Sequence, residues 1–118
     1  GMVSPEERLR ILKSACRDIE NAECFLFAGL TSDFAQSVGA EFIVKGARNA
    51  TDFDYESGLA RIMKKFDEKL ETVILPADPS LAYMSSTYAR ERIRHECDLS
   101  DIADEETARL IGAIYRSK

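Results

Sequence analysis

Histidine and cysteine are scarce in this chain of 118 residues, which contains one histidine and three cysteines. Cys16, Cys24 and Cys97 lie far apart, with no CxxC pair and no histidine cluster near them. Neither a zinc site nor a framework of disulfides is therefore predicted. Because free cysteine is among the most frequently buried residue types, we expect each cysteine to be a small core residue in a reducing compartment.

Long apolar runs are also missing, since no segment approaches the roughly eighteen consecutive apolar residues that a membrane span requires. A net charge of −5 argues against a nucleic-acid surface built on bulk charge. No secretory or transit segment precedes the first expected helix, so a cytoplasmic location is expected. Without repeats, linkers or low-complexity tracts, residues 1–118 are expected to form a single domain.

Helix and strand patterns alternate along the chain. Apolar residues recur at helical spacing after cap residues Ser4, Asp52, Ser85 and Asp104. Helices are expected over residues 5–19, 32–38, 52–66, 85–95 and 104–115. Short apolar runs predict buried strands over residues 23–27, 41–44 and 72–75. The alternation predicts an α/β fold with a parallel sheet and helices on both faces.

Two cations and a glycine follow the strand expected over residues 41–44, in the sequence Lys45-Gly46-Ala47-Arg48. Ser85-Ser86-Thr87 begins a later helix, where hydroxyl groups and free backbone N–H groups favour an anion. Open α/β sheets bind ligands beyond the carboxyl ends of their strands, which is where the Lys45 loop is expected. The pattern indicates a site for a phosphate compound.

Four segments together resemble the bacterial phosphopantetheine adenylyltransferases. They are the helix start Ser4-Pro5-Glu6-Glu7-Arg8, residues 42–56, the Glu71-Thr72-Val73-Ile74-Leu75-Pro76 strand and Tyr83-Met84-Ser85-Ser86-Thr87. These enzymes transfer AMP from ATP to 4'-phosphopantetheine, forming dephospho-coenzyme A and diphosphate. The resemblance implies a Rossmann-like three-layer fold, cytoplasmic coenzyme A biosynthesis, and ATP, phosphopantetheine and coenzyme A as ligands. Mg²⁺ would accompany ATP.

The resemblance also implies site residues. Phosphopantetheine would meet Thr31 and Lys45. ATP would meet Gly46, Ala47, Arg48, Glu56, Leu81, Ala82, Tyr83, Met84, Ser85, Ser86 and Thr87. Three of these positions depart from the family pattern. Lys45 replaces an arginine and lacks its planar fork, Leu81 replaces a common aromatic residue, and Thr31 stands at a position that is usually apolar.

The larger departure is the absence of the family's first two strands and their Thr-x-Gly-x-His signature. The fold is therefore expected to be truncated, with no catalytic histidine and no catalytic activity in the isolated chain. His95, near a helix end, is expected to be structural. In the family, the missing strands lie between those matching residues 23–27 and 41–44. We expect the chain to pair these two strands directly or to close the gap with another copy, as a homo-oligomer.

Simpler interpretations remain for the same residues. Lys45 and Arg48 could be solvated loop charges, Glu56 could pair with a nearby lysine, and Ser85 is first of all a helix cap. Three hypotheses follow: an adenylyltransferase or a fragment of one, a noncatalytic nucleotide-binding or phosphate-binding module, and an oligomeric structural remnant.

Overall fold

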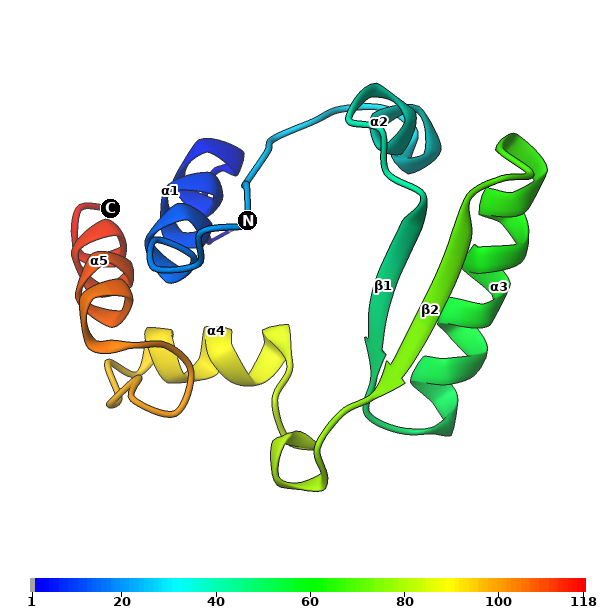
Figure 1. Cartoon of the computed structure of the whole chain (residues 1–118). Helices are drawn as coiled ribbons and strands as arrows, with labels where there is room; N and C mark the ends of the chain where they lie inside the picture. Colours follow the sequence, from blue (N-terminus) through cyan, green and yellow to red (C-terminus); the bar gives the residue numbers. More distant parts are fainter. Residues whose placement is uncertain (1) are drawn as a thin grey trace. The chain divides into compact units, whose positions relative to one another are not determined.

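The computed structural model describes residues 2–118 of the chain. Its elements are α1 (Pro5–Ala15), α2 (Thr31–Ser37), β1 (Phe42–Ala47), α3 (Ala50–Phe66), β2 (Glu71–Pro76), the 3-10 helix η1 (Pro79–Leu81), α4 (Ser86–Arg94) and α5 (Glu105–Arg116) (Figure 1). They form two compact units, which we describe separately. Unit 1 comprises Gly1–Leu26 and Met84–Lys118, and unit 2 comprises Phe27–Tyr83. The single domain expected from the sequence stays a prediction.

Unit 2 contains a strand–helix–strand motif. β1 and β2 pair in parallel, from Phe42 opposite Glu71 to Ala47 opposite Pro76. The intervening α3 packs along both strands (Figure 1). A parallel pair requires a long crossover connection, and the helix provides it. The predicted α/β class with a parallel sheet is confirmed.

Apolar side chains on the strands of unit 2 remain exposed. Phe42, Val44, Val73 and Leu75 expose 57%, 63%, 40% and 54% of their surface. Alternate residues of a strand point to opposite faces, so these four belong to the face of the pair away from the half-buried Ile43 and Ile74. The expectation that both strands are buried on both faces is wrong.

The strand expected over residues 23–27 does not form. Residues 22–28 have no regular secondary structure, and Phe25 and Phe27 expose 49% and 43% of their surface. A strand exists only with a hydrogen-bonded neighbour, and within residues 2–118 the only sheet is the β1–β2 pair. Two ways of closing the gap in the sheet were expected. Direct pairing of this segment with β1, the first of them, does not occur in the described part of the chain.

Unit 1 is built on the packing of α1 against α5. Its buried residues include Leu99, Thr107, Ile111 and Ile114, and the hydroxyl groups of Ser14 and Thr107 are 2.8 Å apart.

No helix within residues 2–118 has the length and apolar character needed to cross a membrane. All three cysteines are free, and Cys97 is exposed, so its expected place in the core is wrong.

The sequence predicted three of the four helix caps. Ser4 forms a capping box with Glu7, Ser85 accepts from the Tyr88 N–H, and Asp104 caps α5. The prediction for α3 is wrong, because Asn49 is its cap and accepts a 2.9 Å hydrogen bond from the backbone N–H of Asp52. Helix α1 ends at Ala15, four residues earlier than predicted. The shift at α3 leaves the Asp52 carboxylate available to another partner.

Candidate functional site

The carboxyl ends of β1 and β2 meet the start of α3 in unit 2. Ala47 pairs with Pro76 at the last position of the register, and the Ala77 N–H donates to the Ala47 carbonyl oxygen over 2.9 Å. Only Arg48 and Asn49 separate β1 from α3. The positive end of the α3 dipole therefore lies beside the last residues of β1, an arrangement that favours anions.

Asp52 holds Arg48 at this edge. Its Oδ2 accepts from the Arg48 backbone N–H over 3.1 Å and from the guanidinium Nε over 3.0 Å. The pKa of Asp52 lies below its usual 3.8, chiefly because the Arg48 side chain donates to the carboxylate and secondly because the Arg48 backbone N–H does so. The guanidinium direction is thus fixed by a residue that the sequence interpretation treated only as a cap. The helical spacing rule for opposite charges could not reveal this pairing, because Arg48 lies before the cap of α3.

The expectation that Lys45 lies in a loop after the strand is wrong, because β1 continues to Ala47. From within β1, Lys45 forms the second ion pair, with Glu56. Lys45 Nζ is 3.5 Å from Glu56 Oε2, and the two side chains are 41% and 17% exposed. The same Oε2 is buried and has no hydrogen-bond partner among the described atoms. The structure thus brings together two of the predicted site residues, and the lysine expected near Glu56 is Lys45.

Gly46 and Ala47 offer backbone rather than side-chain contacts. A Cβ atom placed on Gly46 would meet no heavy atom within 4 Å, so the space beside it is open. The Ala47 side chain is 8% exposed and belongs to the core. At both positions, the group left for a ligand is the main chain.

The loop after β2 carries more of the predicted residues. Asp78 Oδ1 accepts from the backbone N–H of Ser80 over 2.9 Å and from its hydroxyl over 2.7 Å, which fixes the entry to η1. Leu81 and Tyr83 are 47% and 46% exposed, and Ala82 is the C-terminal cap of η1. Thr31 is half-buried at the first position of α2.

The remaining predicted residues, Met84, Ser85, Ser86 and Thr87, belong to unit 1. Ser85 Oγ accepts from the Tyr88 N–H over 3.0 Å, and Thr87 Oγ1 accepts from Arg90 Nη2 over 3.4 Å. The first amides of α4 have no intrahelical partner, as at any helix start. This unit therefore supplies a second anion-favouring group, which is described apart from the first.

The single histidine lies outside these groups of residues. His95 is the C-terminal cap of α4, its side chain is 72% exposed, and Nε2 is 3.5 Å from Glu91 Oε2. Its expected structural role stays a prediction. Within residues 2–118, no group of three or more histidine, cysteine or acidic side chains is placed to hold a metal ion.

Comparison with known proteins agrees with this architecture. A profile of the cytidylyltransferase-like family matches residues 1–92, a range that includes β1, α3 and β2. The phosphopantetheine adenylyltransferase of Lachnoclostridium phytofermentans is 34% identical over 113 residues, covering 96% of this chain and 69% of that protein. The enzyme of Finegoldia magna is 33% identical, with 96% and 70% covered. That of Cytophaga hutchinsonii is 38% identical over 89 residues, with 75% and 59% covered. The chain belongs to the phosphopantetheine adenylyltransferase family.

Proposed function

We propose that this chain binds ATP and 4'-phosphopantetheine, the substrates of the adenylyl transfer that forms dephospho-coenzyme A in the cytoplasm. The supporting observation is the pair of oriented cations at the carboxyl edge of β1, where Asp52 holds Arg48 and Glu56 lies beside Lys45. The names of the relatives supply the substrate class.

Each group has a separate role in the proposal. Arg48 contacts the triphosphate of ATP, and Asp52 keeps its guanidinium in position. Lys45 supplies a point charge to the phosphate of phosphopantetheine, beside Thr31. The amides and hydroxyl groups at the start of α4, in unit 1, are a separate group that favours an anion. Mg²⁺ would be held mainly by the phosphates of ATP, whose negative charge it would partly neutralise.

The proposed activity of these 118 residues alone is binding without turnover at ordinary enzyme rates. Adenylyl transfer depends on positioned charges around the transferred phosphorus. The chain's one histidine caps the end of α4 and pairs with Glu91, so it does not provide such a charge. A noncatalytic nucleotide-binding module is thus the second candidate for the chain by itself.

Calorimetry with ATP, and separately with coenzyme A, tests the proposed site. The wild-type chain should give saturable heats that Arg48→Ala removes, whereas Arg61→Ala, on the exposed side of α3, should leave them unchanged. Equal heats in all three proteins would exclude Arg48 from the site. Formation of dephospho-coenzyme A at ordinary rates from Mg²⁺, ATP and phosphopantetheine would overturn the proposal that the chain alone is inactive.

We further propose that copies of the chain associate through the open edge of β1 and the exposed apolar face formed by Phe42, Val44, Val73 and Leu75. Unpaired strand edges with apolar side chains favour pairing between chains. Light scattering after size exclusion measures the mass. A mass equal to the 13.2 kDa monomer at high concentration would contradict the proposal.

A further inference from the structure

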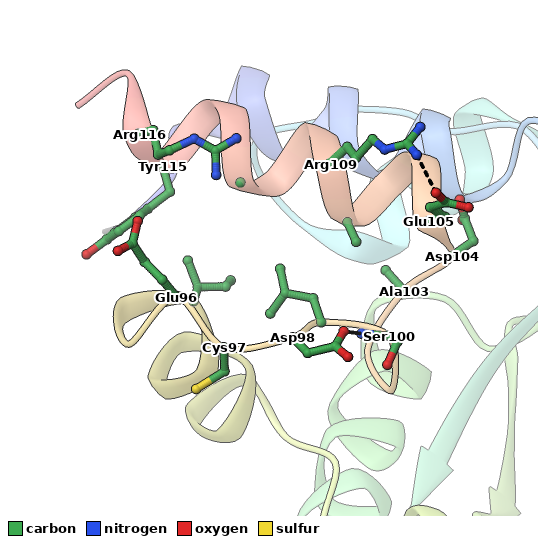
Figure 2. A pocket seen from close by; sticks show the side chains of 14 residues that line it. Glu96, Cys97, Asp98, Ser100, Ala103, Asp104, Glu105, Arg109, Tyr115 and Arg116 are labelled. Atoms are coloured by element: carbon green, nitrogen blue, oxygen red, sulfur yellow. Dashed lines mark hydrogen bonds and ion pairs between the residues drawn. The ribbon is translucent and has the colours of Figure 1, made fainter.

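Unit 1 contains two cavities of similar size with different charge. One, of about 620 Å³, lies between α5 and the segment before it, and its wall carries both acidic and basic side chains (Figure 2). Arg109 on this wall is paired with Glu105 (Figure 2). The wall of this first cavity therefore mixes charges of both signs.

The second cavity, of about 680 Å³, is lined by four cations and no acidic residue. The lining residues are Met2, Val3, Ser4, Pro5, Arg8, Ile11, Arg90, Ile93, Arg94, Ile111 and Lys118. They come from α1, α4, α5 and the chain ends beside α1 and α5, all in unit 1. Four cations around one cavity are unexpected in a protein with a net charge of −5.

Two of the four cations have carboxylate partners outside the cavity wall. Lys118 Nζ is 2.6 Å from Glu7 Oε1, and Arg94 Nη1 is 3.0 Å from Glu91 Oε1. Within residues 2–118, no carboxylate pairs with Arg8 or Arg90, and Arg90 meets only the Thr87 hydroxyl, at 3.4 Å. The cavity therefore retains uncompensated positive charge, which an anion would neutralise.

An apolar groove continues from the wall of this cavity. It has a volume of about 380 Å³ and shares Arg8, Ile11 and Ile111 with the cavity. Its other lining residues are Leu12, Ala15, Ile102, Ala103 and Thr107. A cationic cavity that opens into an apolar groove fits a molecule with an anionic head and an apolar chain.

We propose that this cavity and groove bind a small organic phosphate, with the phosphate between Arg8 and Arg90 and the apolar chain against Ile11 and Ile111. Both arginines offer forked donors suited to phosphate oxygens. The volumes are in the range of small-molecule sites. The proposal is independent of the nucleotide site proposed above, because it uses neither Lys45 nor Arg48.

The inference can be tested by titrating the full chain with hexyl phosphate and, separately, with inorganic phosphate. Binding is monitored by amide NMR shifts and by calorimetry. Hexyl phosphate should bind saturably and more tightly than inorganic phosphate, with shifts confined to α1, the second half of α4 and α5. The double variant Arg8→Gln/Arg90→Gln should weaken binding at least about tenfold, as expected for the loss of charge-assisted hydrogen bonds.

Two matched variants test whether the loss of affinity is specific to this cavity. Arg10→Gln changes an arginine on the same helix that does not line the cavity, and it should leave the affinity unchanged. Arg61→Gln, on α3, changes another arginine that does not line the cavity and should also leave the affinity unchanged. No saturable binding, equal affinity in the double variant, or an equal loss in Arg10→Gln would overturn the proposal. Sedimentation of the chain with phosphatidic acid vesicles would point to a membrane headgroup and would overturn the assignment to a small ligand.

Discussion

Two glycines allow the fold and the ligand to be tested separately. Gly46 lies in β1 and Gly58 lies in α3, and a Cβ atom placed on either would meet no heavy atom within 4 Å. Neither has a positive φ. Substitution by alanine therefore causes no strain, and it reduces the conformational entropy of the unfolded chain. We expect Gly46→Ala and Gly58→Ala each to stabilise the fold by about 0.4–1 kcal/mol.

The two substitutions should differ in their effect on ATP. The family resemblance implies that ATP meets Gly46, where only the main chain can contact it, and a methyl group there would occupy the open space. One lost hydrogen bond to a charged group costs about 1.5–3 kcal/mol, which corresponds to a decrease in affinity of about 10- to 100-fold. Gly58 is in the interior of α3, so its alanine variant should retain the wild-type affinity.

Thermal unfolding, monitored by circular dichroism, measures the stability of each variant. Calorimetric titration with ATP measures its affinity. The expected outcome is a rise in Tm of a few degrees for both variants, with lost affinity only in Gly46→Ala. Unchanged affinity in that variant would show that the main chain at this position does not contact the ligand. A fall in its Tm would show that the space beside Gly46 is needed by the fold itself, and the local reasoning would be wrong.

Three further predictions concern unit 1. Thr107→Val should destabilise the chain by about 1–3 kcal/mol in urea unfolding, because the buried Thr107 side chain loses the hydroxyl that contacts Ser14 and Asp104. Thr107→Ser should retain most of the stability, and equal stability of Thr107→Val and wild type would contradict this. Hydrogen bonds from the backbone N–H of Thr107, and secondly from its hydroxyl, lower the pKa of Asp104 from 3.8 to about 2. The resulting stability is present above pH 3.8 and is lost as the pH falls through about 2. The Tm of the wild type should decrease more than that of Asp104→Asn over this pH interval, and parallel decreases would refute the linkage. Partial burial raises the pKa of the Cys24 thiol, so iodoacetamide at neutral pH should modify the exposed Cys97 first. Peptide mass spectrometry would show the order of modification, and faster modification of Cys24 would be inconsistent with its burial.

Local signals in the sequence were sufficient to predict three of the four capped helix starts. Ser4, Ser85 and Asp104 act through side-chain contacts to amides three residues away, so the relevant residues are neighbours in sequence. The α/β class also followed from the alternation of patterns. The cap of α3 was wrong by one turn, because both Asn49 and Asp52 are suitable cap residues and only the structure shows that Asp52 pairs with Arg48.

Features that depend on distant partners were not predictable in the same way. The apolar pattern of residues 23–27 is compatible with a strand, but strand formation requires a neighbouring strand, and local sequence does not specify whether one is present. Burial of β1 and β2 was wrong for the same reason, since it depends on what covers their second face. The ion pair between Lys45 and Glu56 was predictable only in part. The sequence suggested that Glu56 pairs with a lysine, but it did not identify which lysine.

The contacts between α1 and α5 have a consequence for folding during synthesis on the ribosome. Ser14 and Thr107 are 93 positions apart, and Glu7 and Lys118 are 111 apart. Unit 2 is a continuous segment whose last residue is Tyr83, so its residues are all synthesised before α5 begins. At about 5–20 residues per second, the nascent α1 waits on the order of ten seconds for its packing partner. During that interval its apolar side is open to chaperones and proteases, and the yield of folded chain depends on how the cell protects it.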